Sequence, residues 1–272
     1  MMWDLKDKVA VVTGGGSGIG RAMALTFAAQ GMHIAIADVD LAAADSVAAE
    51  VRSKGVKAIT AKVDVTDRTQ MGAFAERVFS ELGGTHVLCN NAGVATFVPA
   101  HELTDDDWDW VVGVDLIGVI YGIQAFLPGM FTQAQGGHIV NTSSIAGQVP
   151  LQGIVPYHTA KYAVVGLTES LAIDLAPDHI GASVLCPGLV KTRIGQSSRN
   201  RPDRLGGPGP DDSSVQSGIN ATGFNPMDVA ALVLKAVQED QLYILTHPEY
   251  RSMVEARRDK ILAAYDWAAK GA

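Results

Sequence analysis

Along most of the chain, short runs rich in β-branched residues alternate with alanine-rich segments of helical period. We predict strands over residues 9–13, 33–38, 58–63, 86–90, 138–143, 182–186 and 242–245, and helices over 18–30, 41–54, 68–82, 108–131, 157–176 and 226–240. Strands separated by helices pair in parallel, because each helical crossover carries the chain back to the same edge of the sheet. The pattern therefore predicts an α/β fold, with a doubly wound, seven-stranded parallel sheet flanked by helices.

Length and composition limit the class of protein. With 272 residues, 47% apolar and 18% charged, the chain fits a single domain over residues 1–272 with a well-buried core. A formal net charge of −8 argues against nucleic acid or an anionic membrane surface as the main partner. The charged start of the chain, and the lack of an uninterrupted apolar run of about 18 residues, predict a cytoplasmic protein. Cys89 and Cys186 are expected to be buried thiols, and no cysteine or histidine cluster has the spacing of a metal site.

A glycine-rich turn over residues 13–20 joins the first predicted strand to the first predicted helix. Glycines at such a junction let backbone amides and the helix N-terminus approach a pyrophosphate group. In another context the same string would indicate only a tight turn, but its place at the start of an alternating α/β chain favours dinucleotide binding. We expect Gly14, Ser17, Gly18 and Ile19 to contact the cofactor.

The second predicted strand ends at Asp38, about 20 residues beyond the glycine-rich turn, where a carboxylate can accept hydrogen bonds from adenosine ribose hydroxyls. The 2′-phosphate of NADP would meet a like charge there, and at about 4 Å this repulsion amounts to about 4 kcal/mol at an effective dielectric constant near 20. No cation stands at Ser17 or Val39 to offset it. The sequence therefore favours NAD, and the alternative role for Asp38 is that of a solvated turn residue.

Tyr157 and Lys161 lie four residues apart in a predicted helix, so both side chains leave one face of it, and Ser144 precedes the tyrosine by 13 residues. A phenol that exchanges protons near neutral pH needs its pKa lowered by about 3 units, roughly 4 kcal/mol. A neighbouring ammonium can supply much of that stabilisation, so we expect Lys161 to lower the pKa of Tyr157. The three side chains together indicate a hydride-transfer site.

With further motifs at residues 64–65, 90–93 and 187–192, the chain resembles the short-chain dehydrogenase/reductase family over nearly its full length. The resemblance implies a Rossmann-type domain in which Ser144 orients the substrate oxygen and Lys161 binds the nicotinamide ribose beside Tyr157. It implies a small-molecule substrate and a homotetramer or homodimer. It also implies cofactor contacts near the adenine, along the cleft and at the nicotinamide carboxamide, from Asp64, Val65, Asn91, Ala92, Gly93, Tyr157, Lys161, Pro187, Gly188, Val190 and Thr192.

One position departs from the family pattern, because residues 114–119 read Val-Asp-Leu-Ile-Gly-Val where the family usually has Asn in place of Asp115. In the family that Asn belongs to a helix irregularity, whose main-chain carbonyl holds a water leading from the lysine to solvent. If the backbone bend is kept, the resemblance implies that Asp115 completes a catalytic group with Ser144, Tyr157 and Lys161. If it is lost, the proton relay is weakened.

Two polar neighbours of these residues are predicted to lie outside the reaction. Ser143 is the rival of Ser144, but the family spacing favours Ser144 and leaves Ser143 a strand residue with a local hydrogen bond. His158 is offset from Tyr157 by about 100° around the helix, which predicts a surface or interface residue.

Residues 193–225 form a long stretch without an apolar period, rich in glycine, proline, serine and charge. Loops of this length inside compact domains are usually functional lids or disordered. We predict a substrate-binding lid loop with an apolar inner edge at Ile194 or Leu205. Its arginines at 199, 201 and 204 are expected to form a solvated face.

The favoured function is that of an NAD-dependent oxidoreductase that interconverts a secondary alcohol and a ketone. Residues 238–245, residues 248–251 and the long lid are similar to a subgroup that includes Cα-dehydrogenases of lignin-type aryl ethers. Apolar side chains suited to an aryl or alicyclic carbinol are expected in the pocket, namely Val94, Phe97, Val149, Leu151, Ile154, Leu189 and Ile194.

Three alternatives remain open at this point. A steroid or terpenoid alcohol would fit an apolar pocket equally well. An NAD-binding regulatory protein that lost the chemistry would explain Asp115 but not the intact Ser144, Tyr157 and Lys161. A sugar-nucleotide epimerase on the same fold would need a larger substrate domain than this chain offers.

Overall fold

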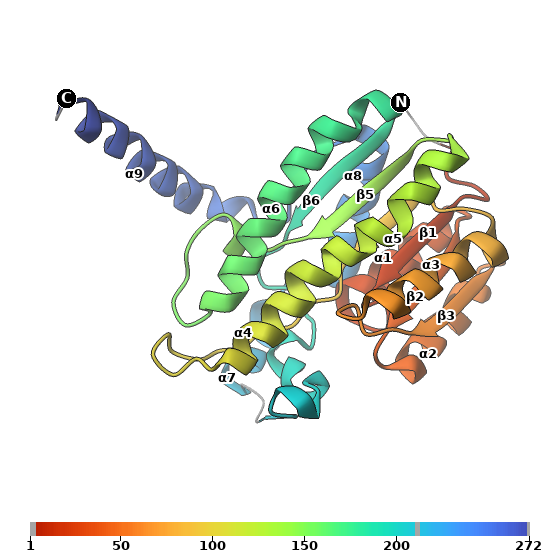
Figure 1. Ribbon diagram of the computed structural model, residues 1–272, viewed down its shortest axis with the longest axis horizontal. Coiled ribbons are helices and arrows are strands. Elements are labelled where there is room, and N and C mark those ends of the chain that lie inside the picture. The colour runs from red at the N-terminus through yellow and green to blue at the C-terminus, as the bar shows by residue number, and fades with distance from the viewer. Residues whose placement is uncertain (1–3, 210–212, 271–272) are drawn as a thin grey trace.

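A computed structural model of the chain describes residues 4–209 and 213–270. Its strands are β1 (Val9–Thr13), β2 (His33–Asp38), β3 (Ala58–Lys62), β4 (Val87–Asn90), β5 (Gly137–Thr142), β6 (Ile180–Cys186) and β7 (Tyr243–Leu245). They form one sheet in the order β3-β2-β1-β4-β5-β6-β7, and all pairs are parallel (Figure 1). The winding direction reverses between β1 and β4, so the prediction of a doubly wound, seven-stranded parallel sheet is confirmed.

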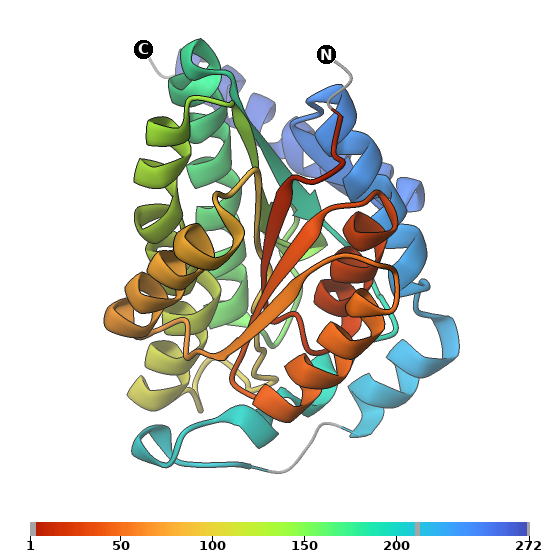
Figure 2. The ribbon, with the colours of Figure 1, turned by 90° about the vertical axis from the view of Figure 1, so that its right-hand side faces the viewer.

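Helices cover both faces of this sheet (Figure 2). One face carries α1 (Gly18–Ala29), α2 (Leu41–Arg52) and α8 (Pro226–Glu239), and the other carries α3 (Arg68–Leu82), α5 (Gly118–Gln133) and α6 (Val155–Leu175). Buried apolar side chains form one cluster under each set of helices. In β1, Ala10 and Val12 belong to the first cluster while Val9 and Val11 belong to the second. This burial on both faces explains why the strands read as continuous apolar runs.

The single helix predicted over residues 108–131 is wrong in detail. The segment consists of α4 (Asp105–Val112), a π-helical turn (Gly113–Ile117) and α5. Thr104 caps α4 by accepting a hydrogen bond from the Asp107 amide, and the Asp107 carboxylate accepts one from the Thr104 amide in return. The π turn contains Asp115, so the departure from regular helix falls where the altered family motif lies.

The segment 193–225 is more ordered than the loop we predicted. It contains two short 3-10 helices, Ile194–Asn200 and Asp203–Leu205, and a further helix, α7 (Ser213–Thr222). Residues 210–212 lie outside the described part of the chain. Contacts with distant parts of the chain, described below, stabilise a segment that has too little apolar content to fold alone.

A final helix, α9 (Arg251–Lys270), was not predicted from the sequence. It extends away from the body of the molecule (Figure 1), and none of its residues is buried.

By length and composition alone, the stretch Asp105–Gln133 could cross a membrane. It comprises α4, the π turn and α5, and Val119, Ile123 and Phe126 of α5 pack into the protein core. The core helix of a soluble protein meets the same criterion, so this stretch is weak evidence for a membrane span.

Candidate active site

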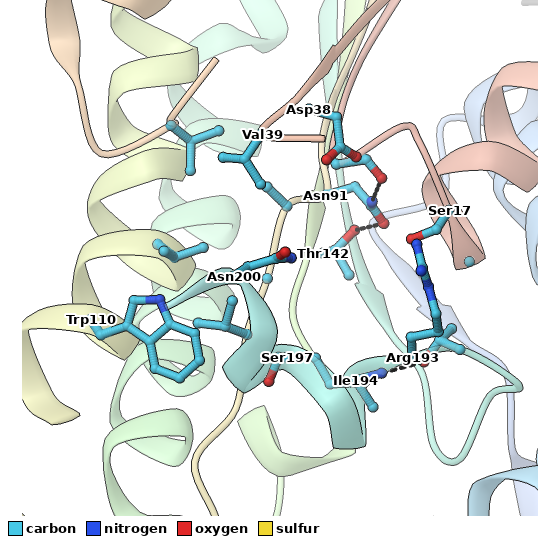
Figure 3. A pocket seen from close by; sticks show the side chains of 18 of the residues that line it. Ser17, Asp38, Val39, Asn91, Trp110, Thr142, Arg193, Ile194, Ser197 and Asn200 are labelled. Carbon is cyan, nitrogen blue, oxygen red and sulfur yellow. Dashed lines mark hydrogen bonds between the residues drawn. The ribbon is translucent and has the colours of Figure 1, made fainter. Parts of the chain in front are cut away.

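A cleft of about 800 Å³ opens at the carboxyl ends of the central strands (Figure 3). Ligands of doubly wound sheets bind at this edge, where the order of the strands reverses. The cleft is lined by all the residues predicted to contact the cofactor, namely Gly14, Ser17, Gly18, Ile19, Asp38, Asp64, Val65, Asn91, Ala92, Gly93, Tyr157, Lys161, Pro187, Gly188, Val190 and Thr192. The fold therefore brings six separate stretches of sequence to one hollow.

The glycine-rich turn leaves room for an anion. Gly14 has a positive φ of 62°, and a Cβ on Gly20 would overlap the carbonyl oxygen of Gly14. Asn91 closes the turn by donating from Nδ2 to the Thr13 carbonyl oxygen at 3.1 Å. Ser17, at the N-cap of α1, makes no side-chain capping bond, so the amides of the first helical turn stay open toward the cleft. These features fit a pyrophosphate group.

Asp38 stands at the end of β2 with its carboxylate held toward the glycine-rich turn. Its Oδ2 accepts from the Gly16 amide at 2.8 Å, and its Oδ1 accepts from the Asp40 amide at 3.0 Å. The residue is half-buried and lines the cleft, and a carboxylate has further lone pairs to accept hydrogen bonds from a ligand. The chain therefore offers a carboxylate acceptor at this end of the cleft, where Lys62, the register partner of Asp38 in β3, also lines the wall.

Tyr157 and Lys161 lie on consecutive turns of α6, and Ser144 follows β5. The Lys161 Nζ lies 5.3 Å from the centre of the Tyr157 ring and donates to the Thr142 carbonyl oxygen at 3.0 Å. All three side chains line the cleft. Ser143 also lines the cleft, but it donates from Oγ to the Lys161 carbonyl oxygen at 2.7 Å, the kind of local hydrogen bond predicted for it.

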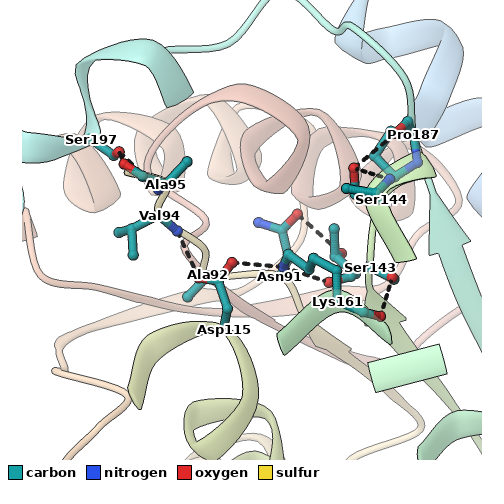
Figure 4. A network of polar contacts seen from close by, with 12 residues as sticks. Asn91, Ala92, Val94, Ala95, Asp115, Ser143, Ser144, Lys161, Pro187 and Ser197 are labelled. Atoms are coloured by element: carbon teal, nitrogen blue, oxygen red, sulfur yellow. Dashed lines mark hydrogen bonds and ion pairs between the residues drawn. The ribbon is translucent and has the colours of Figure 1, made fainter. Parts of the chain in front are cut away.

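Asp115 lies behind the cleft rather than in its lining, and it is fully buried (Figure 4). Its Oδ2 forms an ion pair with the Lys161 Nζ at 3.1 Å, and its Oδ1 accepts from the Val94 amide at 2.8 Å. The π turn aims the side chain at α6, so the bend persists with Asp in the place of Asn. Because this residue is Asp rather than Asn, its contact with Lys161 joins a carboxylate to an ammonium group.

This buried ion pair sets the electrostatics of the site. Burial is the largest influence on Lys161 and would lower its pKa, but the charges of Asp115 and Tyr157 and the hydrogen bond to Asp115 together raise that pKa. Burial raises the pKa of Asp115, although the Lys161 charge opposes the rise. Burial also raises the pKa of Tyr157, against the Lys161 charge, and the Asp115 charge adds to the rise. The Lys161 charge thus lowers the pKa of Tyr157, as predicted, but burial and the Asp115 charge keep that pKa above its ordinary value.

His247 was missed in the sequence, yet it holds the loop that follows β6. Its Nδ1 accepts from the Gly188 amide at 3.1 Å, and its Nε2 lies 3.2 Å from the Leu189 carbonyl oxygen. The ring is buried between Phe224 and Tyr250, with ring centres 4.8 and 5.4 Å away. His247 thus fixes the backbone of the segment predicted to hold the nicotinamide carboxamide.

His158 is not the surface residue that its helical position predicted. Its Nδ1 lies 2.6 Å from the Ala146 carbonyl oxygen, and its Nε2 accepts from the Leu151 amide at 2.6 Å. The half-buried ring therefore ties the loop after Ser144 to the start of α6. A helical wheel cannot reveal this contact, because the bonded groups belong to the preceding loop.

The segment after Thr192 is anchored over the cleft at three points. Ser197 Oγ accepts from the Ala95 amide and donates to its carbonyl oxygen, each at 3.0 Å. Leu205 is buried in a cluster with Val94, Trp110 and Val111, and the Tyr157 ring packs against that cluster. The apolar inner edge predicted at Ile194 or Leu205 is present, since both residues line the cleft.

The third anchor is Arg201, for which we predicted a solvated position. Its Nη1 pairs with the Asp107 carboxylate at 2.7 Å, and its guanidinium lies 5.4 Å from the centre of the Trp110 ring. Its Nε also donates to the Leu205 carbonyl oxygen. Arg199 and Arg204 line the cleft. The prediction of a solvated arginine face is therefore wrong for Arg201, because the segment folds back against α4, whereas Arg199 and Arg204 are exposed.

The predicted apolar lining is only partly present. Val94, Leu189 and Ile194 line the cleft, and Trp110, Val114, Leu205 and Ile219 join them. Val149 lines a second cavity beside α9 instead. Phe97, Leu151 and Ile154 lie outside both linings. Leu151 and Ile154 belong to the loop that His158 holds against α6.

Comparisons with known proteins agree with this geometry. The family model for short chain dehydrogenases matches residues 8–203. A CLA biosynthesis dehydrogenase/reductase of Lactiplantibacillus plantarum is 33% identical over 272 residues, which cover 96% of this chain and 95% of the relative. A C alpha-dehydrogenase of a Sphingobium species is 36% identical over 266 residues, which cover 96% and 87%. A short chain dehydrogenase/reductase from Burkholderia phymatum, solved in complex with NAD, has a TM-score of 0.92 and 37% identity over 97% of both chains.

The match to the family model spans well over half of the chain, and both relatives exceed 30% identity over nearly all of it. The seven-stranded sheet and the helices that flank it have the same arrangement as in the solved neighbour. The chain therefore belongs to the short-chain dehydrogenase/reductase family, with a resemblance to its Cα-dehydrogenases, and is an oxidoreductase that acts on alcohols.

Proposed function

We propose that this protein is an NAD-dependent dehydrogenase that interconverts a bulky secondary alcohol, aryl or alicyclic, and its ketone. The observation that carries the proposal is the convergence of Ser144, Tyr157 and Lys161 on one cleft whose other end presents the Asp38 carboxylate. The intact reactive side chains speak against a regulatory protein without chemistry. The solved relative that contains NAD supports a nicotinamide nucleotide as the cofactor.

When bound, NAD supplies the hydride acceptor, or NADH the donor. In alcohol oxidation the Tyr157 phenolate oxygen would take the proton from the substrate hydroxyl, and in ketone reduction the Tyr157 phenol would give its proton to the substrate oxygen. The Ser144 hydroxyl donates a hydrogen bond to the substrate oxygen, which stabilises negative charge there. The Lys161 ammonium favours the phenolate form of Tyr157 by its charge and remains bonded to Thr142 and Asp115.

The predicted residues that line the cleft would hold the cofactor along its length. Asp38 would accept from the adenosine ribose, with Asp64 and Val65 beside the adenine. Residues 14 and 17–19 would meet the pyrophosphate, and Asn91, Ala92 and Gly93 would line the middle of the cleft. Pro187, Gly188, Val190 and Thr192 would hold the carboxamide end, and Lys161 the ribose next to it.

The substrate class follows from the lining of the remaining part of the cleft. Val94, Trp110, Leu189, Ile194 and Leu205 make that part largely apolar. The C alpha-dehydrogenase among the relatives supports an alcohol substrate. A steroid or terpenoid alcohol remains the second candidate, because an apolar lining does not distinguish an aryl group from an alicyclic one.

A direct test is the appearance of NADH absorbance when the purified protein meets NAD and a panel of alcohols. The panel should pair each bulky secondary carbinol, including a lignin-type aryl ether and a hydroxysteroid, with the matched primary alcohol. We expect turnover of at least one bulky secondary carbinol and little turnover of primary alcohols. Binding of NAD without turnover of any alcohol would favour the regulatory alternative.

Cofactor choice provides the first specific prediction. We expect NAD to exceed NADP by at least about tenfold in kcat/KM, because the Asp38 carboxylate would repel a 2′-phosphate. Replacing Asp38 with Ala should reduce the ratio of kcat/KM for NAD to kcat/KM for NADP, mostly through a lower KM for NADP. Asp45→Ala is the matched control, since Asp45 is exposed on α2 and lies outside the lining of the cleft. Equal use of the two cofactors by the parent protein would contradict the assignment.

The buried pair leads to a prediction about pH. The Asp115 charge contributes to the raised pKa of Tyr157, so Asp115→Asn should lower that pKa and free the Lys161 charge to favour the phenolate. Because the phenolate is the base in alcohol oxidation, the rising limb of kcat/KM should move to lower pH, with roughly a threefold gain at pH 7. The Kd for NAD should stay unchanged. If the rising limb of kcat/KM stays at the same pH in Asp115→Asn, the role of Asp115 is limited to the backbone bend.

We also propose that residues 193–225 are the substrate-binding lid of the single domain. The anchors at Ser197, Arg201 and Leu205 support this role, because they hold the segment against the far wall of the cleft. Loss of the Arg201–Asp107 ion pair would release the segment from α4 and expose the substrate end to water.

We propose, finally, that the protein acts as a homo-oligomer in the cytoplasm, with α9 as part of the interface. The helix leaves Tyr265 and Trp267 exposed by 72% and 79%, and a cavity of about 730 Å³ separates its apolar side from Val149 and Pro150. It has five Lys or Arg against three Asp or Glu, a formal +2, while the rest of the chain carries −10. An acidic second copy is therefore complementary to it in charge and in apolar surface.

Measuring the mass in solution by light scattering tests this assignment. Ile261 lines the cavity beside α9, so Ile261→Glu should place a charge in the contact and reduce the mass toward that of a monomer. Ala263→Glu is the control, because Ala263 lies about 200° further around the helix. A monomeric parent protein, or an unchanged mass for Ile261→Glu, would contradict the interface.

A further inference from the structure

Arg193 directly follows Thr192, at the point where the carboxamide-binding loop passes into the lid. It lines both the main cleft and an adjoining hollow, together with Ser17 and Gly18 of the glycine-rich turn. Figure 3 shows its side chain extended toward Ser17. The guanidinium therefore faces the turn from the opposite wall of the cleft.

The backbone of Arg193 is fixed while its side chain is free. Its carbonyl oxygen accepts from the Gln196 amide at 3.0 Å and from the Arg199 Nη1 at 3.1 Å. Within the described part of the chain, the guanidinium of Arg193 forms no ion pair and no hydrogen bond, although it is exposed. An extended arginine with a fixed backbone, aimed at a ligand cleft, is available to bind an anion.

On the opposite wall, the Asp38 carboxylate at the end of β2 accepts from the Gly16 amide, while the amides of the first turn of α1 have no side-chain acceptor. The first turn of α1 has no acidic residue, and its N-cap makes no side-chain bond. Elsewhere in the fold, Asp40, Asp67, Thr104 and Asn225 cap α2, α3, α4 and α8 with a side-chain oxygen. Open helix amides on one side and an unpaired guanidinium on the other form an electropositive gap.

We propose that Arg193 closes the pyrophosphate site of the nucleotide from the lid side and so couples cofactor binding to the position of the lid. This inference rests on the proposed function only in that a nucleotide diphosphate occupies the cleft. The guanidinium offers paired N–H donors to the phosphate oxygens, while the amides of the glycine-rich turn bind from the other side. Because Arg193 is the N-cap of the 3-10 helix that carries Ser197, a bound diphosphate holds the anchored segment in place over the cleft.

The test compares ligands that differ in their phosphates, using the whole chain and calorimetric titration with NAD, ADP-ribose and adenosine. Arg193→Met keeps the side-chain stem and removes the charge. We expect its Kd for NAD and ADP-ribose to rise at least about tenfold, and its Kd for adenosine to stay within about twofold. The affinity of the parent protein for NAD should fall more steeply with salt than that of the variant.

Two further variants separate a specific contact from general charge. Lys191→Met removes a neighbouring exposed cation of the same hollow and should change the Kd for NAD by less than about twofold. Arg193→Lys should recover only part of the affinity, because an ammonium lacks the planar fork of donors. Equal effects of Lys191→Met and Arg193→Met, or an equal loss for adenosine, would overturn the inference.

The outcomes also distinguish this inference from the proposed function. If the parent protein binds NAD and Arg193→Met binds it equally well, the role of Arg193 is wrong and the dehydrogenase proposal stands. If the parent protein binds neither NAD nor ADP-ribose, the proposed function is overturned and the inference falls with it.

Discussion

Tyr157→Phe is expected to reduce kcat for alcohol oxidation by at least about 100-fold while the Kd for NAD stays within about twofold. The substitution removes only the hydroxyl that exchanges the proton, and the ring that packs against the cluster of Val94, Trp110 and Leu205 remains. The variant should therefore keep its affinity for NAD while it loses turnover. Stopped-flow measurement of NADH formation gives the rate, and calorimetric titration gives the affinity.

Tyr162→Phe is the matched control for this result. Tyr162 lies on the same helix, but its ring faces His158 and Arg257 rather than the cleft. Its loss should leave kcat within about twofold of the parent value. If Tyr157→Phe retained more than a tenth of the parent kcat, another group would have to move the proton.

The second large effect is expected for Lys161→Met, which should lower both turnover and stability. Turnover should fall by at least about 100-fold, because the variant loses the charge that favours the Tyr157 phenolate. The free energy of unfolding should fall by about 3 kcal/mol, since Asp115 would keep only the Val94 amide as partner in a fully buried site. The Kd for NAD should rise as well, through the lost ribose contact.

The double variant Lys161→Met, Asp115→Asn isolates the cause of the instability. Neutralising the orphaned carboxylate should restore most of the lost free energy of unfolding, measured in urea, without restoring turnover. Lys235→Met is the control, because Lys235 pairs with Glu239 at 3.9 Å on the surface and should cost less than about 1 kcal/mol. A double variant as unstable as Lys161→Met would show that packing, rather than the buried charge, is responsible.

Local sequence patterns were sufficient to predict the sheet and most of the residues that line the cleft. The seven strands could be located because burial on both faces demands continuous apolar runs, and α3 begins at Arg68 and ends at Leu82 as predicted. The glycine-rich turn and Asp38 could be predicted because strand ends converge on one edge of a parallel sheet. Helical spacing put Tyr157 and Lys161 on one face, as α6 has them.

The structure of segments outside the sheet was harder to predict from the sequence. The stretch 193–225 has low apolar content, so its short helices depend on contacts such as Ser197 with Ala95, 102 residues away. The arginine cluster shows the same limit, because Arg201 is 94 residues from its partner Asp107. In α9 no residue is buried, so no core-facing period marked it.

The sequence by itself determined the class of fold, the edge of the sheet that carries the cleft, and the residue types gathered there. These follow from periods of two and 3.6 residues and from motifs of fixed spacing, which are local properties. Only the tertiary structure decided the electrostatic state of the site. Asp115 contacts Lys161 because a π turn and a helix cross, and the pKa of Tyr157 rises because the fold buries it. Burial and contact between distant segments depend on how elements pack, and packing is a property of the whole chain.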